Sequence, residues 1–375
     1  MQSILSSDDI KHILVVRLNK VGDMICTIPL LKTLRHHFKN AKITMLAEKP
    51  SAEIFTDTAL VDDLIIYTRK HSLLRNRHLE VRKLLMDYKM RSNVKFDVAI
   101  GVKGGFSSFL AIIVFLSGAK IRIGYISNKN YLLNWCYNFP VNPIDFSMVH
   151  QTEACLNLLT AVGVHDFIKD TTIPIPSEQR DSAYKFLISN GLNPGNKIAV
   201  FNISNNRKTS TWQSANFIKL GKLLFENNGF RCIITCILSD RDKAIKICNE
   251  MKGNALFYET RHIMNFAAMV SMANFLIAGD GGAVHISASV GTPVVALFGQ
   301  TNPAIYGPCG GGHIVLMSPN GDVNSITADT VFSAVRSGGR CLDMAPIKII
   351  DYSAFGETIF SEEQIKMSER KQQGN

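Results

Sequence analysis

The chain has 375 residues, 46% of them hydrophobic and 19% charged, a composition that excludes extensive intrinsic disorder. Lys and Arg together number 41 and Asp and Glu 31, which gives a net charge of +10 and points toward anionic partners or surfaces. At about 150 residues per domain the length predicts two or three domains, and the large size of α/β domains favours two.

Cysteine spacing and apolar runs narrow the class of protein further. The eight Cys residues are scattered and form no C-x-x-C pair, which argues against a zinc ribbon or a thioredoxin-type site. Two Asp residues precede only a short apolar run at the start, so we expect no secretory signal. The longest apolar stretch, residues 106–119, is too short to span a bilayer. We therefore expect a soluble cytoplasmic protein with reduced cysteines.

In the first half, short β-branched runs alternate with helical patterns, as is typical of βαβ units around a parallel sheet. Strands are expected at residues 12–18, 42–47, 63–68, 96–102 and 120–125, and helices at residues 24–38, 51–57, 72–91, 106–117 and 150–162. The segment TTIPIPSEQRD (171–181) follows, and neither of its prolines fits inside a helix. This segment is the predicted domain boundary.

The second half repeats the same order. Strands are expected at residues 197–203, 231–238, 254–258, 274–280, 293–299 and 313–317, and helices at residues 179–190, 214–228, 240–251, 262–272, 283–290 and 326–337. We therefore predict two Rossmann-like, doubly wound α/β domains, residues 1–172 and 173–340, that face each other across a cleft. Residues 341–375 are predicted to form a polar C-terminal extension.

The positive charge is concentrated in residues 69–95, which hold nine basic and two acidic residues. Such a run can be an ordinary solvated helix surface, or it can bind a polyanion or an anionic membrane. No nucleic-acid-binding motif accompanies it, so we expect no nucleic-acid partner.

The first polar turn follows the first strand, where Gly22 and Asp23 precede an amphipathic helix. A carboxylate at a helix start is favoured by the exposed N–H groups alone, so Asp23 could be purely structural. At the carboxyl edge of a sheet, it could also accept a proton from a nucleophile.

The second polar turn lies in FNISNNRKTSTW (201–212), again directly after a strand. Arg207 and Lys208 could hold a diphosphate, and Ser204, Thr209 and Ser210 could donate further hydrogen bonds. An ordinary solvated loop explains the same residues equally well.

The third polar turn, Gly279-Asp280-Gly281-Gly282, ends a strand and opens a helix near Ala283. Small residues there let backbone N–H groups approach an anion, and the helix start supplies a favourable field. His285 lies in the first helical turn and could point at such an anion. The spacing is neither that of a Walker loop nor that of a dinucleotide fingerprint.

Together these turns resemble glycosyltransferase family 9, the ADP-heptose:lipopolysaccharide heptosyltransferases. The similar stretches, in order, are residues 13–34, 96–125, 150–164, 202–217 and 279–303. The last is the most specific, because DGGAVH (280–285) is similar to the family's D-[ST]-G-x-x-H, with Gly281 in place of Ser or Thr. The resemblance implies a two-domain GT-B architecture and inverting sugar transfer without a metal or other cofactor.

The same resemblance implies roles for individual residues. Asp23 matches the proposed general base. The residues implied for the nucleotide-sugar donor are Ser204, Arg207, Lys208, Thr209, Asp240, Asp242, Asp280, Gly281, Gly282, Ala283 and His285. The basic residues expected at an anionic glycolipid or glycan acceptor are Lys20, Arg69, Lys103 and Arg122. Either Arg207 or Lys208 would hold the diphosphate, and either Asp240 or Asp242 would contact the ribose.

The expected activity is transfer of heptose from ADP-heptose to a lipopolysaccharide core or related glycan. Peripheral contact with the cytoplasmic face of the inner membrane would fit the basic segment. Residues 101–108 lack the acidic residue and second Lys common in the family, which leaves the acceptor open. The alternatives are a nucleotide-sugar epimerase or hydrolase of the same fold, and a binding protein without catalytic activity.

Overall fold

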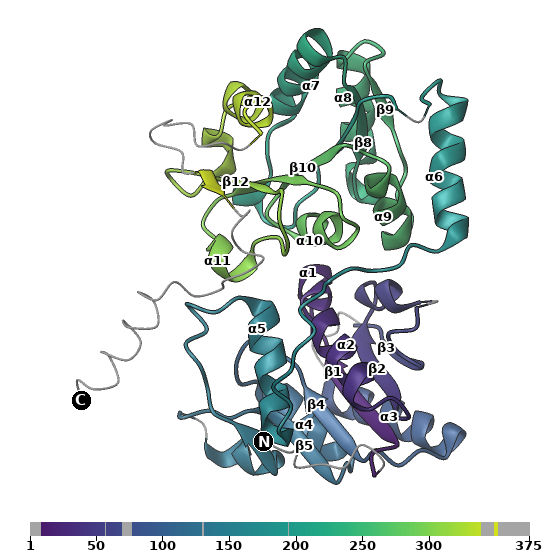
Figure 1. Ribbon diagram of the computed structural model, residues 1–375, viewed down its shortest axis with the longest axis vertical. Helices are drawn as coiled ribbons and strands as arrows, with labels where there is room; N and C mark the ends of the chain where they lie inside the picture. The colour runs from purple at the N-terminus through teal and green to yellow at the C-terminus, as the bar shows by residue number, and fades with distance from the viewer. Residues whose placement is uncertain are drawn as a thin grey trace, which may run out of the picture. The chain divides into compact units, whose positions relative to one another are not determined.

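The computed structural model describes residues 9–56, 58–69, 77–129, 131–193, 195–338 and 349–351. The chain divides into two compact units inside helix α6 (Ser177–Ser189), between Lys185 and Phe186, and the first unit also takes in residues 261–268 and 304–306. The predicted boundary after residue 172 lies slightly earlier. Residues 171–176 form neither helix nor strand, in agreement with their two prolines (Figure 1).

The first unit is built on a six-stranded parallel sheet in the order β3-β2-β1-β4-β5-β6. Its strands are β1 (His12–Arg17), β2 (Lys42–Glu48), β3 (Asp63–Tyr67), β4 (Val98–Gly101), β5 (Ile121–Tyr125) and β6 (Phe139–Val141). The order reverses between β1 and β4, and the loops after these two strands therefore diverge at the carboxyl edge of the sheet. In doubly wound folds ligands bind at this position.

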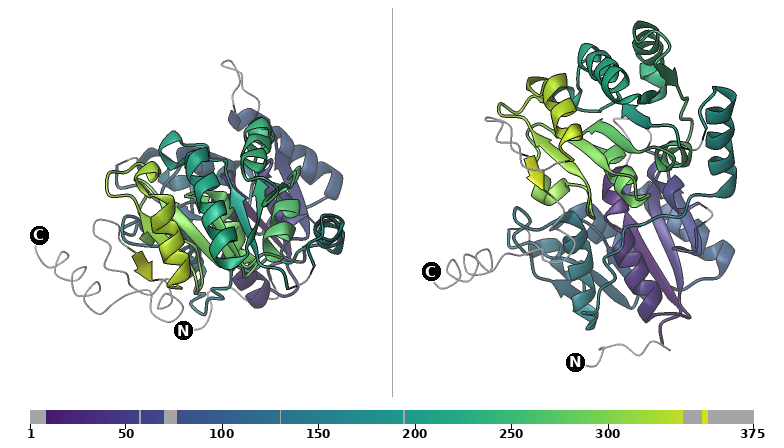
Figure 2. Two further views of the ribbon diagram at one scale, coloured as in Figure 1. Left: turned by 90° about the horizontal axis from the view of Figure 1, so that it is seen from above. Right: turned by 45° about the horizontal axis from the view of Figure 1, so that its top comes forward.

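Helices cover both faces of this sheet, as the buried residues along β1 require (Figures 1 and 2). They are α1 (Val21–Ile25), α2 (Ile28–His37), η1 (Ser51–Phe55), α3 (Arg77–Ser92), α4 (Ser108–Leu116), η2 (Tyr131–Cys136), α5 (Gln151–Leu156) and η3 (Asn157–Val162), where η denotes a 3₁₀-helix. Helices α3 and α4 and η2 pack on one face, whose core includes Leu14, Val16 and Val114. The helix predicted at residues 24–38 is two helices, with Pro29 in the first turn of α2.

The second unit contains a seven-stranded sheet in the order β13-β12-β11-β10-β7-β8-β9. Its strands are β7 (Ile198–Asn202), β8 (Arg231–Thr235), β9 (Ala255–Phe257), β10 (Phe275–Gly279), β11 (Val294–Phe298), β12 (Ile314–Met317) and β13 (Ile349–Asp351). Six of them repeat the strand order of the first sheet, and β13 adds an antiparallel edge. The predicted fold of two doubly wound α/β domains is confirmed.

The helices of the second half include the short turns that follow its strands. They are η4 (Lys208–Ser210), α7 (Ser214–Asn228), η5 (Leu238–Asp240), α8 (Arg241–Glu250), α9 (Ile263–Ser271), α10 (Gly282–Ser289), α11 (Pro303–Tyr306), η6 (Val323–Ser325) and α12 (Ala328–Arg336). Trp212 anchors the core beside η4: its indole Nε1 donates to the Ile326 carbonyl at 2.8 Å, and its ring meets Phe217 edge-on.

Several short elements escape the sequence analysis, among them β6, η2, η4, α11, η6 and β13. Strand β13 lies inside the predicted polar extension, and the other residues of that extension lie outside the described part of the chain. Across the described residues, no helix has the length and hydrophobicity that crossing a bilayer demands.

Candidate functional site

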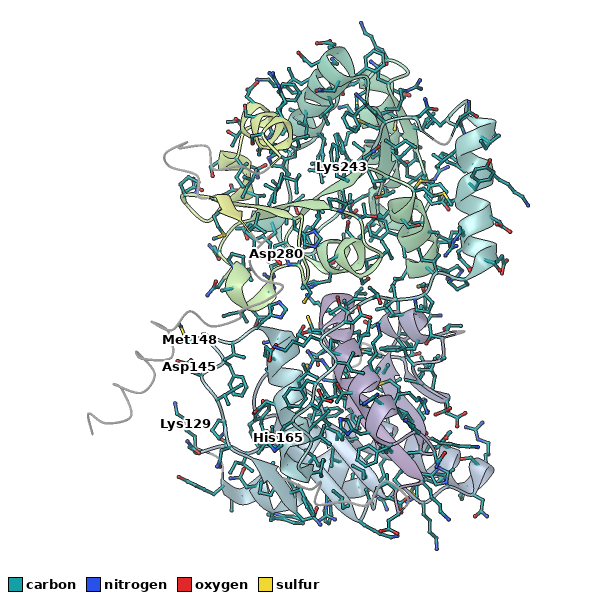
Figure 3. The ribbon with its side chains drawn as sticks, in the orientation of Figure 1. Lys129, Asp145, Met148, His165, Lys243 and Asp280 are labelled. Carbon is teal, nitrogen blue, oxygen red and sulfur yellow. The ribbon has the colours of Figure 1, made fainter. Side chains whose placement is uncertain are left out.

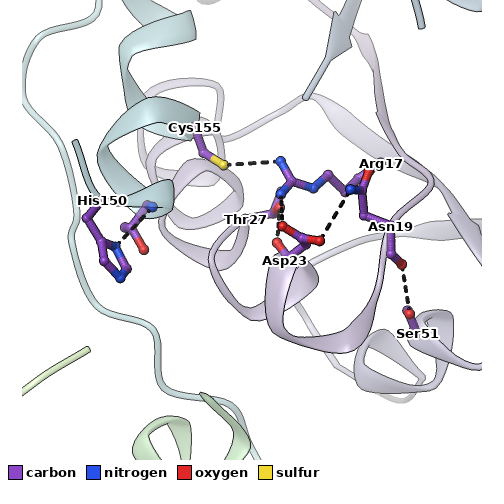
Figure 4. Close-up of polar contacts among 8 residues, drawn as sticks. Arg17, Asn19, Asp23, Thr27, Ser51, His150 and Cys155 are labelled. Atoms are coloured by element: carbon purple, nitrogen blue, oxygen red, sulfur yellow. Dashed lines mark hydrogen bonds and ion pairs between the residues drawn. The ribbon is translucent and has the colours of Figure 1, made fainter. Parts of the chain in front are cut away.

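In the first unit, Asp23 lies in the short helix α1, directly beyond the carboxyl end of β1 (Figure 4). Its Oδ1 accepts a hydrogen bond from Arg17 Nη2 at 2.8 Å, and its Oδ2 accepts one from Asn19 Nδ2 at 3.2 Å. The Thr27 hydroxyl donates to the Asp23 backbone carbonyl at 2.9 Å. Side chain and backbone of this residue are therefore both held in place.

Arg17 is a buried charge that the sequence analysis missed. It is the last residue of β1, its side chain is 0% exposed, and its Nη1 lies 3.5 Å from Cys155 Sγ in α5. Burial opposes the charged form of Arg17, but the Asp23 carboxylate counteracts burial through its charge and its hydrogen bond, and the pKa of Arg17 ends above its ordinary value. Burial likewise raises the pKa of Cys155, which keeps this group a neutral thiol at pH 7.

The Asp23 carboxylate keeps capacity for a further partner. An ionised carboxylate offers about four lone-pair positions, and Arg17 and Asn19 occupy one each. The Asp23 side chain is 24% exposed, so a hydroxyl group arriving from solvent can reach it. This geometry suits a proton acceptor better than a purely structural helix cap, because no side-chain cap hydrogen bond forms at the start of α1 and the Asp23 carboxylate accepts from Arg17 and Asn19 instead.

Three of the four predicted acceptor residues lie at the carboxyl edge of the first sheet. Lys20 precedes α1, Lys103 follows β4, and Arg69 follows β3. The first two come after adjacent central strands, because β1 pairs with β4. Arg69 follows the strand at the sheet's edge.

Arg122 is placed differently from the other three. It is the second residue of β5 and therefore lies toward the amino end of the sheet, away from the loops that follow the strands. Its Nε donates to the Cys136 carbonyl at 2.8 Å and its Nη1 to the Ala119 carbonyl at 3.0 Å. These bonds tie β5 to η2, and this structural role argues against the predicted acceptor contact.

In the second unit, the turn after β7 meets the turn after β10, two strands that lie side by side where the strand order reverses. Arg207 Nη1 lies 3.1 Å from Asp280 Oδ2 and 2.6 Å from Thr301 Oγ1 (Asp280 is labelled in Figure 3). Asn205 Nδ2 donates to the Asp280 carbonyl at 2.7 Å. Burial raises the pKa of Asp280, while the Thr301 hydroxyl and the Arg207 charge act in the opposite direction.

Two glycines allow this close approach. A Cβ on Gly279, the last residue of β10, would lie 2.1 Å from the Ser210 carbonyl oxygen. A Cβ on Gly299, just after β11, would lie 2.6 Å from the Gly321 carbonyl oxygen and 3.2 Å from that of Thr209. The η4 turn, which carries Lys208, can therefore lie directly against the ends of both strands.

Helix α10 starts at Gly282 beside this turn, and no side chain caps its first N–H groups. An uncapped helix start attracts anions through its N–H groups and the helix dipole. Gly281 precedes the helix in an extended conformation, and His285 is buried in its first turn. The residues predicted for the donor in this segment, Asp280, Gly281, Gly282, Ala283 and His285, therefore lie at one helix start without a side-chain cap.

The remaining predicted donor residues differ in how they are held. Ser204 Oγ donates to Asp240 Oδ2 at 2.5 Å, which joins the turns after β7 and β8. Asp242 is exposed at the start of α8. Thr209 and Lys208 are exposed in η4, and the Lys208 ammonium has no hydrogen-bond or ion-pair partner among the described residues.

Asn205 and Thr301 are further site residues that the sequence analysis missed. Asn205 lies inside the second polar turn and Thr301 inside the family-like stretch 279–303, but their partners are 75 and 94 positions away along the chain. Arg17 had one usable signal, a single charged residue in the apolar run HILVVRL. Nowhere in the described ranges do three or more His, Cys, Asp and Glu side chains gather in a group that could hold a metal ion.

The contact at Gly279 can be tested by adding one methyl group. We expect Gly279→Ala to lower the free energy of unfolding by about 1–3 kcal/mol, because its Cβ would overlap the Ser210 carbonyl. Gly281→Ala is the matched control, since its Cβ would come no closer than 3.5 Å to any neighbour, and it should change stability by less than about 0.5 kcal/mol. Urea unfolding followed by circular dichroism measures both. Equal stability of the two variants would contradict the packing described.

Comparison with known proteins agrees with the family resemblance found in the sequence. Residues 88–333 match the model of glycosyltransferase family 9 (heptosyltransferase). The lipopolysaccharide heptosyltransferase 3 of Escherichia coli K12 is 24% identical over 76% of this chain and 82% of its own length.

Solved structures agree in fold. A glycosyltransferase family 9 protein from Veillonella parvula superimposes with a TM-score of 0.77 at 22% identity, covering 90% of this chain and 99% of its own. The E. coli heptosyltransferase WaaC gives 0.70 at 18% identity, covering 87% and 99%. Because the family model spans well over half of the 375 residues, this chain belongs to glycosyltransferase family 9 and is a glycosyltransferase with the GT-B fold of the heptosyltransferases.

Proposed function

We propose that the protein transfers heptose from ADP-heptose to a hydroxyl group of an anionic glycolipid or glycan of the lipopolysaccharide core, with inversion and without a metal ion. The observation that carries this proposal is the Asp23 carboxylate, which Arg17 and Asn19 orient while part of it stays accessible. Relatives named as lipopolysaccharide heptosyltransferases support the sugar and the acceptor class. We place this activity at the cytoplasmic face of the inner membrane as part of the same proposal.

The nucleotide-sugar would bind in the second unit. The E. coli enzyme WaaC has been solved with ADP and with ADP-2-deoxy-2-fluoro heptose, which supports an ADP-sugar here. The uncapped start of α10 offers N–H groups to the diphosphate. Lys208, which has no partner among the described residues, is the cation we assign to the diphosphate. Arg207 is already held by Asp280 and Thr301, and we assign it the role of fixing that turn.

The acceptor would bind in the first unit, where Lys20, Lys103 and Arg69 follow strands at the sheet's carboxyl edge. Their charges fit phosphate or carboxylate groups on the acceptor. Asp23 accepts the proton of the attacking hydroxyl as its oxygen bonds to the anomeric carbon. The bond from that carbon to the diphosphate breaks, and ADP leaves with the electron pair. Lys208 and the N–H groups of α10 stabilise the charge that grows on the departing diphosphate.

The role of Asp23 can be tested by replacing it with Asn, which keeps an oxygen for Arg17 but cannot take up the proton. We expect Asp23→Asn to lower kcat by a factor on the order of 10²–10⁴. Transfer to a de-acylated lipopolysaccharide core acceptor is measured by mass spectrometry. Asp181→Asn, on the exposed side of α6, is the control and should retain full activity.

Two results would contradict this assignment. Activity of Asp23→Asn within about twofold of the unmodified protein would show that Asp23 is not the base. Release of ADP at an undiminished rate without an acceptor would indicate hydrolysis rather than transfer.

Because Lys208 is assigned to the diphosphate and Arg207 to fixing the turn, replacing Lys208 should affect ADP binding and replacing Arg207 should affect stability. Lys208→Met should weaken ADP binding by about 10- to 100-fold, because a charge-assisted contact to the diphosphate is lost, and it should leave folding unchanged. Arg207→Met should lower the free energy of unfolding by about 1–3 kcal/mol, because buried Asp280 loses a partner. Calorimetric titration with ADP and urea unfolding measure the two effects. Normal ADP binding by Lys208→Met would contradict its assignment.

A further inference from the structure

One outer side of the first unit exposes an unusual number of large apolar side chains. They come from the three elements that pack on the same face of the sheet, α3, α4 and η2. The exposed members are Leu79, Met86 and Met90 of α3, Phe115 of α4, and Tyr131, Leu132 and Trp135 of η2. We call this set of seven residues the apolar face. Leu132 is 83% exposed, and Met90, Tyr131 and Trp135 are each more than half exposed.

Contacts between the elements make the apolar face continuous. The rings of Phe115 and Trp135 meet edge-on with centroids 4.6 Å apart, which joins α4 to η2. Lys89 Nζ donates to the Ser117 carbonyl at 3.0 Å, which holds the second half of α3 against the end of α4. Met86 and Met90 lie on either side of Lys89 along α3.

The core does not account for these side chains. Helix α3 already buries Val81 and Leu85 against the sheet, and its opposite side would ordinarily be polar. Leu79, Met86 and Met90 lie seven and four residues apart, a spacing that places them on one side of a helix. Contiguous apolar surface of this kind marks an interaction site.

The segment of the chain that carries the apolar face is strongly basic. Ten basic and three acidic residues lie between positions 77 and 138. Among the acidic ones, Asp97 is paired with Lys120, and Glu80 accepts a hydrogen bond from Tyr67. Arg82 and Lys83 are exposed between Leu79 and Met86, and Lys129, at the edge of the first unit in Figure 3, is exposed just before η2.

We propose that the apolar face binds an anionic lipid bilayer, with the η2 residues Tyr131, Leu132 and Trp135 in the interfacial layer. Trp and Tyr favour that layer, aliphatic side chains gain by burial beneath it, and Lys and Arg are attracted to anionic headgroups. A second copy of the chain would bring like charges together, and a polyanion in water would leave the apolar side chains exposed. An anionic bilayer accounts for both the exposed apolar side chains and the positive charge of this surface.

This inference deepens the proposed function, because a glycolipid acceptor is held in a membrane. Membrane binding itself can be measured without any sugar transfer. The chain offers a convenient probe, since it has two Trp residues and Trp212 is buried in the second unit. A change in Trp fluorescence on binding therefore reports on Trp135.

The test mixes the full-length protein with vesicles of phosphatidylcholine that contain or lack phosphatidylglycerol, and no glycolipid. We expect flotation with the anionic vesicles and a blue shift of Trp emission, both weakened by high salt. Trp135→Phe should abolish the shift and keep most of the binding.

Matched variants separate the apolar and the charged contributions. Leu132→Glu should reduce the vesicle partition coefficient at least about tenfold. Ile188→Glu, an exposed aliphatic residue of α6, should not. Arg82→Glu with Lys83→Glu should also weaken binding, whereas Arg180→Glu with Lys185→Glu on α6 gives the same change in net charge and should have a smaller effect.

Three outcomes would overturn the proposal. They are failure of the protein to bind anionic vesicles, equal binding by Leu132→Glu and Ile188→Glu, and a dimer in sedimentation velocity that Leu132→Glu dissociates. Transfer to a water-soluble, de-acylated acceptor should be unchanged in Leu132→Glu. If Leu132→Glu loses vesicle binding but keeps transfer, the membrane surface is separate from the catalytic site. If the unmodified protein binds vesicles but transfers no sugar, the proposed function fails while this inference stands.

Discussion

The ion pair between Arg17 and Asp23 is the constraint on which the first unit's chemistry depends. A guanidinium with 0% exposure cannot remain charged in the interior without a compensating carboxylate. Asp23 supplies that carboxylate from the next turn of the chain, 2.8 Å away. The strand therefore fixes the position of Arg17, and Arg17 fixes the position of the carboxylate that we assign as the base. Asn19 and Thr27 remove the remaining freedom of the same turn.

In the second unit, close backbone packing rather than a buried charge fixes the polar turns. Gly279 and Gly299 have no Cβ where the η4 turn approaches, so this turn can lie against the ends of β10 and β11. Arg207 then joins Asp280 and Thr301 across that junction. In both units the polar groups lie at the carboxyl edge where the strand order reverses. A ligand can bind at this edge because the loops after the two central strands leave the sheet in opposite directions.

Much of this arrangement could be predicted from the sequence, because its signals are local. The β-branched runs located all five strands expected in the first half and all six expected in the second. The turns that carry Asp23 and Asp280 were recognisable as polar and glycine-containing segments after strands. Lys208 and Arg207 were found together, but their adjacent positions do not show that Arg207 is held by Asp280 and Thr301 while Lys208 has no partner among the described residues.

The missed features depend on contacts across the fold or on very short elements. Thr301 reaches Arg207 from 94 positions away, so nothing near either residue indicates the pair. Strand β6 contains Pro140, which argues against a strand in sequence and is tolerated because β6 is at the edge of its sheet. Strand β13 is a three-residue segment inside the predicted polar extension. Arg122 was grouped with acceptor residues on its charge alone, whereas its place in β5 gives it the Cys136 and Ala119 carbonyls as partners.

A double-mutant cycle on Arg17 and Asp23 tests the central ion pair most directly. The free energy of unfolding is measured for the unmodified protein, Arg17→Met, Asp23→Ala and the double variant. If the two charges depend on each other, each single change is costly and the double variant costs less than their sum, by more than about 1 kcal/mol. Additive losses would mean that Arg17 does not hold Asp23, and the account of the first unit's site would be wrong.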